Sequence, residues 1–166
     1  MSASKRWRPM VEADLADVMA VAERVHPEHP EDAAVFEERL ALFAAGCAVL
    51  ADDVRLYGYR LGHPWILAEP PGLNTLLARL PATPDTLFLH DLALLPEARG
   101  EGHAREIVEE TLALARASDL GCVSLIALGG SRAFWAVMGF RHGPGAALCG
   151  YGAQAVPMVR AVGSRG

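Results

Sequence analysis

One segment in the middle of the chain combines residue types that can hold a phosphate group. It reads Pro96-Glu97-Ala98-Arg99-Gly100-Glu101-Gly102-His103-Ala104 and joins an apolar stretch to an amphipathic one. Small residues at positions 100, 102 and 104 let a ligand approach the backbone closely. The first N–H groups of a helix that follows have no partner within that helix. The segment therefore predicts a phosphate-binding turn at a helix N-terminus.

Two common phosphate-binding motifs do not fit this segment. A Walker loop requires Gly-Lys-Ser/Thr, which is absent. A dinucleotide-binding fingerprint requires a small residue three positions after Gly102, where the chain has Arg105. The pattern that remains is Arg-x-x-Gly-x-Ala, from Arg99 to Ala104. It resembles the pyrophosphate-binding motif of the GNAT acetyltransferase superfamily.

The resemblance covers about residues 87–141. Residues 92–97 are similar to the strand end that precedes the motif in that superfamily, and residues 133–140 to its later aromatic-x-x-x-Gly-Phe element. The resemblance implies an α/β (α+β) fold: a mixed, mostly antiparallel central sheet of six to seven strands, flanked by about four helices and splayed between the fourth and fifth strands. It also implies acetyl-CoA as the co-substrate.

The same resemblance implies cofactor contacts along the fourth strand and the turn after it. The main chain at Leu92 and Leu94 is expected to pair with the pantetheine arm, with Ala93 between them as a further cofactor contact, and one N–H there is expected to stabilise the developing oxyanion. The pyrophosphate is expected to lie against Arg99, Gly100, Glu101, Gly102, His103 and Ala104. Ser131 stands near an asparagine that contacts CoA in the family, and its position also suits a helix N-cap.

His90 and Asp91 are the two polar side chains in the apolar run 87–95. An unpaired polar group there would be costly, so both require an explanation. Imidazole titrates near neutral pH, and His90 matches the place of a histidine in serotonin N-acetyltransferase-like members. We therefore predict His90 as the general base. Asp91 is expected on the opposite face of a regular strand, unless a bulge intervenes, and is the second candidate for base or amine binding.

Trp135 departs from the family pattern, since many members have a tyrosine there that protonates the leaving thiolate. An indole cannot do this. A thiol with a pKa near ~8.5 leaves tolerably as the anion, and the loss of one general acid reduces the rate about 10²–10⁴-fold. Tyr151, Cys149 and His142 are open as substitutes, and the sequence does not rank them.

The remaining patterns predict the elements that position these residues. Apolar residues recur at helical spacing from Asp14 to Val25 and again over about 31–45. Short apolar runs predict strands at 47–51, 56–61, 65–67, 87–95, 123–128, 140–142 and 154–162, with further helices at 103–119 and 131–138. The proline-rich segment 69–85 is predicted to be a binding loop with one short helix over 73–80.

Size and composition exclude several classes of protein. The 166 residues support one domain, predicted at 1–162 with a frayed tail at 163–166. A net charge of −5 without a basic stripe argues against a nucleic-acid partner. No apolar run approaches the roughly 20 residues that span a bilayer, and no secretory signal is evident, so we expect a cytoplasmic protein without a membrane partner. The three cysteines suggest neither disulfides nor zinc, and no metal is expected.

Together these features predict an acetyl-CoA-dependent N-acetyltransferase whose acceptor is a small-molecule amine. Two alternatives stay open. One is the same activity on a protein N-terminus or lysine, and the other is a catalytically weak acyl-CoA-binding sensor or interaction module of the same fold. Many relatives of this fold dimerise, so a homodimer is a further expectation from the resemblance.

Overall fold

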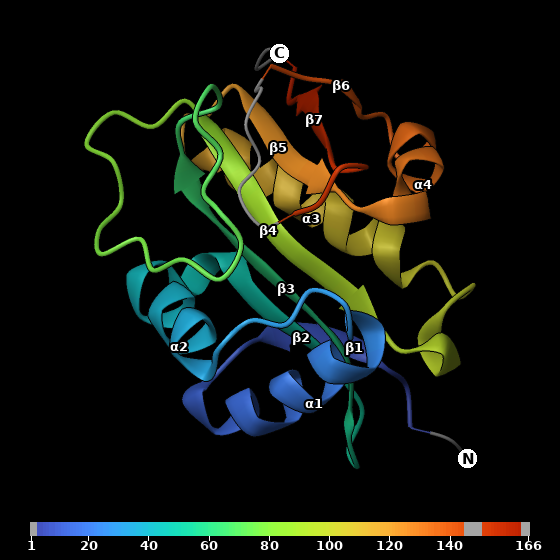
Figure 1. The fold of residues 1–166 in the computed structure, drawn as a ribbon. Coiled ribbons are helices and arrows are strands. Elements are labelled where there is room, and N and C mark those ends of the chain that lie inside the picture. The colour runs from blue at the N-terminus through green and yellow to red at the C-terminus, as the bar shows by residue number, and fades with distance from the viewer. Residues whose placement is uncertain (1–2, 145–150, 164–166) are drawn as a thin grey trace.

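The computed structural model describes residues 3–144 and 151–163, which share one sheet (Figure 1). The strand order in this sheet is β1-β2-β3-β4-β5-β7-β6. Along the chain the elements are β1 (Arg6–Pro9), α1 (Leu15–Val25), α2 (Ala33–Leu42), β2 (Cys47–Ala51), β3 (Leu56–Trp65), β4 (Thr86–Leu94), α3 (His103–Ala117), β5 (Cys122–Ala127), α4 (Arg132–Val137), β6 (Arg141–His142) and β7 (Val156–Ala161). None of the helices in these ranges is long and apolar enough to cross a membrane.

The sheet opens between β4 and β5. These two strands run parallel and pair only at Leu87–Val123 and Phe88–Ser124, whereas the other neighbouring strands are antiparallel. Beyond Phe88, β4 continues to Leu94 with β3 alone as its partner. The prediction of a mixed, mostly antiparallel sheet splayed between its fourth and fifth strands is therefore confirmed.

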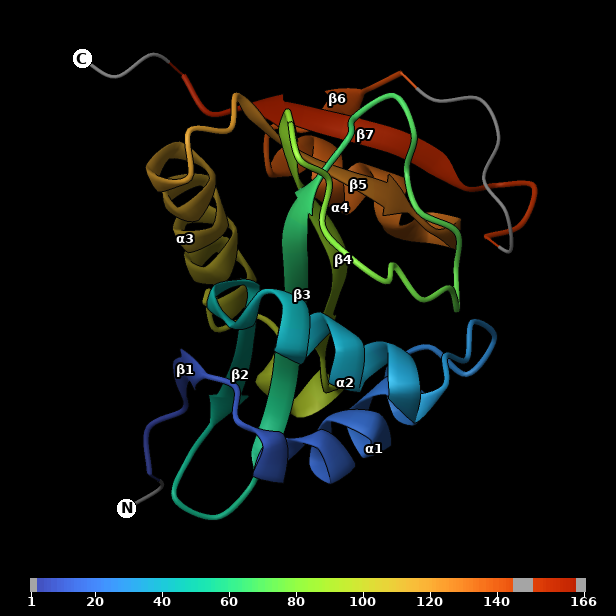
Figure 2. The ribbon, with the colours of Figure 1, turned by 90° about the vertical axis from the view of Figure 1, so that its left-hand side faces the viewer.

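Two apolar clusters hold the helices to opposite faces of the sheet, as Figure 2 shows for α3 and for the α1–α2 pair. The first cluster joins α3 and α4 to β4 and β5 and includes Leu87, Leu89, Val108, Leu112, Leu125 and Trp135. The second joins α1 and α2 to β2, β3 and β4 and includes Val18, Val21, Phe36, Val49, Tyr59 and Ala93. β4 contributes to both clusters, so it is the strand around which the site is built.

The predicted elements differ from those of the structure in three places. β1 was not predicted, and the two predicted strands 56–61 and 65–67 are one strand, β3. Pro64 is tolerated inside β3 because the pairing of β3 with β2 ends at Leu61. The missing N–H of Pro64 therefore breaks no hydrogen bond between β3 and β2. Segment 73–80 forms no helix, since Asn74 and Ala78 have φ values of 54° and 66°, in the left-handed region.

Candidate active site

A bulge in β4 turns His90 and Asp91 to the same face of the sheet. On β3, Leu61 pairs with Asp91 and Gly62 with Leu89, so His90 has no partner in the register. The extra residue reverses the alternation of side chains after Leu89. Leu89 accordingly packs with the α3 cluster, whereas Ala93, an even number of residues later, packs with α1 and α2. A regular strand would have put Asp91 on the opposite face, and the bulge that the sequence left open as an exception is present in the structure.

The two side chains have separate partners on this face. Nε2 of His90 lies 2.8 Å from Oε1 of Glu31, which belongs to the connection between α1 and α2. The His90 side chain has no exposed surface, and its Nδ1 has no hydrogen-bond partner within the described part of the chain. Asp91 lies between His26, whose Nε2 is 2.8 Å from Oδ1, and Tyr59, whose hydroxyl donates to Oδ2.

These contacts shift the ionisation of the group around Asp91. Burial alone raises the pKa of Asp91, but hydrogen bonds from His26 and Tyr59 outweigh it, and the pKa lies below its usual value. Burial likewise lowers the pKa of His26, yet the bond to Asp91 and the Asp91 charge bring it above its ordinary value. The pKa of Tyr59 is raised well above its usual value by burial and by the nearby Asp91 charge. Asp91 is therefore an ionised carboxylate at neutral pH, with both oxygens hydrogen-bonded.

The turn after β4 is the second part of the site. Gly100 and Gly102 have φ values of 77° and 87°, and a Cβ added to either would meet no atom within 4 Å. The backbone N–H groups that start α3 are therefore open to a ligand. Arg99 is held by a 3.1 Å hydrogen bond from its Nε to the Leu94 carbonyl, and the Trp7 indole donates to the His103 carbonyl at 3.0 Å.

Three cavities meet along the splayed part of β4. A cavity of about 540 Å³ lies over the turn, a cleft of about 320 Å³ lies between β4 and β5, and a pocket of about 270 Å³ lies between α1 and α2. Leu92 and Ser131 line both the turn cavity and the cleft. His26 and Asp91 line both the cleft and the α1–α2 pocket. The arrangement can place an anionic ligand at one end and a second molecule at the other, with Asp91 between them.

Comparison with protein families agrees with this geometry. Residues 13–140, more than half of the chain, match the model of the acetyltransferase (GNAT) family. The chain belongs to the GNAT acetyltransferase family. It is therefore an acyltransferase, as the sequence predicted.

Solved GNAT structures share the fold of this acetyltransferase at low sequence identity. The loading GNATL domain of CurA from Lyngbya majuscula has a TM-score of 0.80 at 15% identity and covers 96% of this chain and 98% of its own. The GphF GNAT-like decarboxylase in complex with isobutyryl-CoA has a TM-score of 0.74 at 18% identity and covers 95% of this chain and 99% of its own. The ribosomal-protein-S18-alanine N-acetyltransferase from Escherichia coli has a TM-score of 0.69 at 13% identity and covers 98% of this chain and 97% of its own. Among curated proteins, no sequence matches this one significantly.

Eight of the ten predicted cofactor residues line the turn cavity of this acetyltransferase: Leu92, Leu94, Arg99, Gly100, Gly102, His103, Ala104 and Ser131. Ala93 packs instead with the α1–α2 cluster, and Glu101 forms an ion pair with Lys5 at 3.3 Å and a hydrogen bond with His103 at 2.9 Å. Ser131 is the N-cap residue of α4, as predicted, but its hydroxyl makes no cap bond and donates instead to the Leu128 carbonyl at 2.7 Å.

Trp135 forms an apolar wall of the cleft. Its ring lies 4.9 Å from that of Phe134 and 5.3 Å from that of Phe140, both in edge-to-face contacts. Of the three candidates for the missing acid, Tyr151 donates to the Pro71 carbonyl, His142 is exposed on β6, and Cys149 lies outside the described residues. Neither Tyr151 nor His142 lines the cleft.

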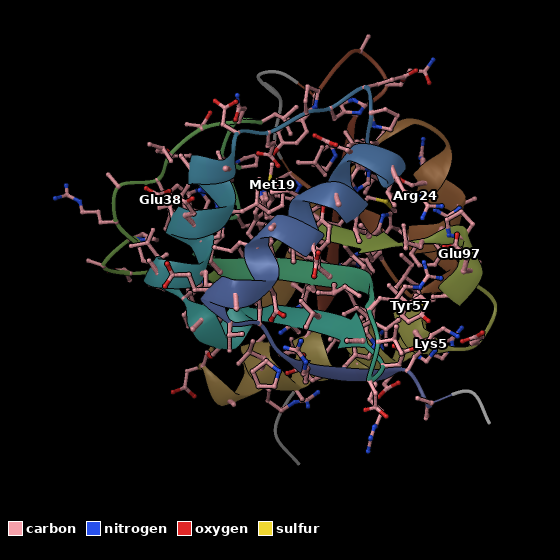
Figure 3. The ribbon with its side chains drawn as sticks, turned by 90° about the horizontal axis from the view of Figure 1, so that it is seen from below. Lys5, Met19, Arg24, Glu38, Tyr57 and Glu97 are labelled. Atoms are coloured by element: carbon pink, nitrogen blue, oxygen red, sulfur yellow. The ribbon has the colours of Figure 1, made fainter. Side chains whose placement is uncertain are left out.

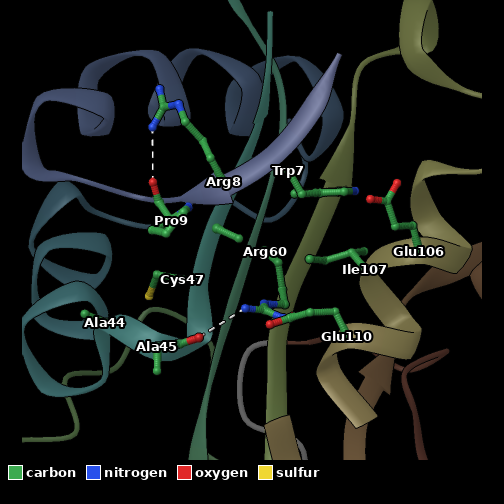
Figure 4. A pocket seen from close by; sticks show the side chains of 11 residues that line it. Trp7, Arg8, Pro9, Ala44, Ala45, Cys47, Arg60, Glu106, Ile107 and Glu110 are labelled. Carbon is green, nitrogen blue, oxygen red and sulfur yellow. Dashed lines mark hydrogen bonds and ion pairs between the residues drawn. The ribbon is translucent and has the colours of Figure 1, made fainter. Parts of the chain in front are cut away.

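A separate groove of about 310 Å³ lies between β1 and α3 (Figure 4). Its buried polar group is Arg60 of β3, which donates to the Ala45 and Gly46 carbonyls and to Thr111, and pairs with Glu110. These bonds connect β3 to α3 and to the residues before β2. We assign Arg60 a structural role, since it holds α3, the helix that begins at the glycine turn after β4.

His63 gives this acetyltransferase an acid-sensitive contribution to stability. Its side chain is fully buried, Nε2 has no partner in the described part of the chain, and burial lowers its pKa to about 3. In the unfolded chain the pKa of this histidine is about 6.5. Between about pH 6.5 and about pH 3 the unfolded chain therefore binds a proton that the native protein does not, so the free energy of unfolding falls as the pH falls. When the pH is lowered from about 7.5 to about 5, we expect the Tm of His63→Phe to fall by less than the Tm of the wild type. Parallel losses in scanning calorimetry would contradict this assignment.

Proposed function

We propose that this acetyltransferase uses acetyl-CoA to acetylate a primary amine, and that the acceptor is a small molecule. The observation that carries the proposal is the line of three cavities along β4. A glycine-lined, basic turn lies at one end, the β4–β5 cleft in the middle, and an acidic pocket at the other end. A donor that carries phosphates and an acceptor that carries a positive charge suit these two ends.

The turn cavity fits coenzyme A. The open backbone at Gly100 and Gly102 and the N-terminus of α3 suit a pyrophosphate, and Arg99 and Arg105 add positive charge to the same wall. The GphF neighbour, whose fold is shared, was solved in complex with isobutyryl-CoA, which supports a CoA thioester here. Acetyl-CoA supplies an acetyl thioester, which an amine converts into an amide with release of the CoA thiol.

β4 supplies the groups that would hold the pantetheine arm. Beyond Phe88 its edge toward β5 has no strand partner, so main-chain N–H and C=O groups between Leu92 and Leu94 are available for pairing with the arm's amides. An N–H on this edge is suited to stabilise negative charge on the thioester oxygen. His90 and Asp91, the two residues that the sequence predicted for base catalysis or amine binding, stand just before this stretch and border the cleft.

The charge around the cleft favours an amine over an acid as the second molecule. The α1–α2 pocket is lined by Glu23, Glu31 and Asp91, and no Lys or Arg is among the described residues that line it. These carboxylates attract an ammonium group and repel a carboxylate. The charge of this pocket therefore supports an amine as the acceptor.

The proposal is tested by thiol release from acetyl-CoA with a panel of small amines and a matched panel of peptides. We expect release that saturates in acetyl-CoA and depends on at least one small primary amine, against a control without acceptor. Turnover with peptides alone would reject the small-molecule acceptor. Tight CoA binding without turnover on any acceptor would reject the transferase proposal altogether.

A further inference from the structure

Two histidines lie beside Asp91, and they differ in their access to a substrate. The His90 side chain has no exposed surface, and its Nε2 faces Glu31. The His26 side chain is 26% exposed and lines both the β4–β5 cleft and the α1–α2 pocket. His90 also borders the cleft, but because its side chain has no exposed surface, the imidazole that a molecule in the pocket can contact is that of His26.

Asp91 fixes the His26 ring in one orientation. One carboxylate oxygen accepts from Nε2 of His26 at 2.8 Å, and the other accepts from the Tyr59 hydroxyl. Because Asp91 is ionised, Nε2 carries the hydrogen of this bond, and Nδ1 is the nitrogen that can accept a proton. A carboxylate that holds an imidazole in this way orients it as a base and stabilises the imidazolium that forms.

The backbone at His26 adds to this effect. His26 is the C-cap of α1, and its N–H bonds to the Ala22 carbonyl at 2.8 Å. The C-terminal end of a helix favours a positive charge. Figure 3 shows Arg24 of α1 beside Glu97 of the turn after β4, and their 3.0 Å ion pair fastens this end of α1 next to the turn.

We propose that Nδ1 of His26 removes the proton from the acceptor's ammonium group, with Asp91 and Tyr59 as positioning residues. The N–H bond of the ammonium breaks, the proton bonds to Nδ1, and the electron pair stays on the amine nitrogen. The imidazolium then returns its proton to water through its exposed face. This inference rests on the proposed function and names the group that makes the amine nucleophilic.

The α1–α2 pocket defines the class of acceptor that His26 would serve. Its volume of about 270 Å³ suits a compact molecule, and its apolar wall is formed by Met19, Ala22, Pro27, Pro30 and Phe36. Glu23, Glu31 and Asp91 line this pocket together with His26 and give it a negative charge. The acceptor is therefore a compact primary amine that is protonated in solution and carries a small apolar body.

Charged groups reach His26 from each neighbouring element. They are Glu23 on α1, Glu31 and His29 on the α1–α2 connection, Tyr59 on β3, His90 and Asp91 on β4, and Arg99 on the turn. Burial and Arg99 lower the pKa of His26, and the Asp91 and Glu31 charges raise it by more. The rate is thus expected to rise with pH through a pKa above the ordinary value for histidine, since protonated His26 cannot accept a proton.

His26→Gln tests the assignment, because glutamine can still bond to Asp91. We expect kcat/KM near neutral pH to fall about 10²–10⁴-fold. The ionisation of His26 should disappear from the pH profile, and the deficit should shrink above about pH 9, where more of the amine is already neutral. His142→Gln removes an exposed imidazole on β6, away from the residues that line the cleft and the α1–α2 pocket, and should keep the shape of the wild-type profile.

A second measurement does not depend on turnover. NMR titration of the free protein should give His26 a pKa above its ordinary value, and Asp91→Asn should lower that pKa. A wild-type value at or below the ordinary one would overturn the inference, as would a profile abolished by His90→Gln and unchanged by His26→Gln. If no amine is acetylated by the wild type, the proposed function fails, while the titration still decides whether Asp91 activates His26.

Discussion

Arg99→Glu is expected to weaken binding of CoA by about 100-fold or more. Arg99 lines the turn cavity, and the substitution removes a cation from the wall assigned to the pyrophosphate and adds an anion there. A loss of about 3 kcal/mol, within the range of one or two charge-assisted hydrogen bonds, corresponds to roughly 100-fold in Kd. The side chain is exposed, and within residues 3–144 and 151–163 its hydrogen bond is to the Leu94 carbonyl, so Tm should change little. Isothermal titration calorimetry with CoA measures the effect.

Arg79→Glu is the matched control for this experiment. It makes the same change of charge at an exposed arginine in the connection between β3 and β4, outside the residues that line the cavity. Its Kd for CoA should stay within about twofold of the wild-type value, since surface charges separated by more than about 10 Å are largely screened. If both variants bind CoA as the wild type does, the Arg-x-x-Gly-x-Ala turn is not the phosphate site.

The part of the site that could be predicted from the sequence is built from consecutive residues. Arg99 to Ala104 form a local turn with two glycines at positive φ and the start of one helix, and a sequence motif encodes all of these features. β4 was predicted for the same reason, since nine neighbouring residues form the apolar run 87–95. The number of strands in the sheet was also predicted, but through two errors that cancel. β1 was not predicted, and β3 was predicted as two strands.

The groups around Asp91 could not be predicted in this way. His26, Glu31 and Tyr59 come from α1, from the connection after it and from β3, and no spacing in the sequence brings them to β4. The bulge is likewise a property of two strands, because it exists only in the register of β4 against Leu61 and Gly62. Prolines around His26 suggest a solvated loop, whereas the fold turns its ring toward a buried carboxylate.

Gly46→Ala is expected to destabilise the protein by about 3 kcal/mol or more, the upper end of the range for overpacking. A Cβ at Gly46 would lie 1.9 Å from the carbonyl oxygen of Gly62 and 2.8 Å from the Phe43 ring. The first of these contacts is with backbone and cannot be relieved by a change of rotamer, so β3 must move away from the residues before β2. At about 2–4 °C per kcal/mol, Tm should fall by roughly 6–12 °C in scanning calorimetry.

Gly121→Ala provides the control, since a Cβ there would meet no atom within 4 Å and Gly121 is exposed before β5. Its effect should stay within about 0.5 kcal/mol. The Gly46 variant also bears on catalysis, because Gly62 pairs with Leu89 immediately before the bulged His90. Any shift of Gly62 changes the register that turns His90 and Asp91 to one face. The folded Gly46→Ala protein should therefore lose acetyl transfer while the turn that contains Arg99 still binds CoA. Equal losses of CoA binding and of transfer would show that the bulge in β4 and the turn after it are not independent.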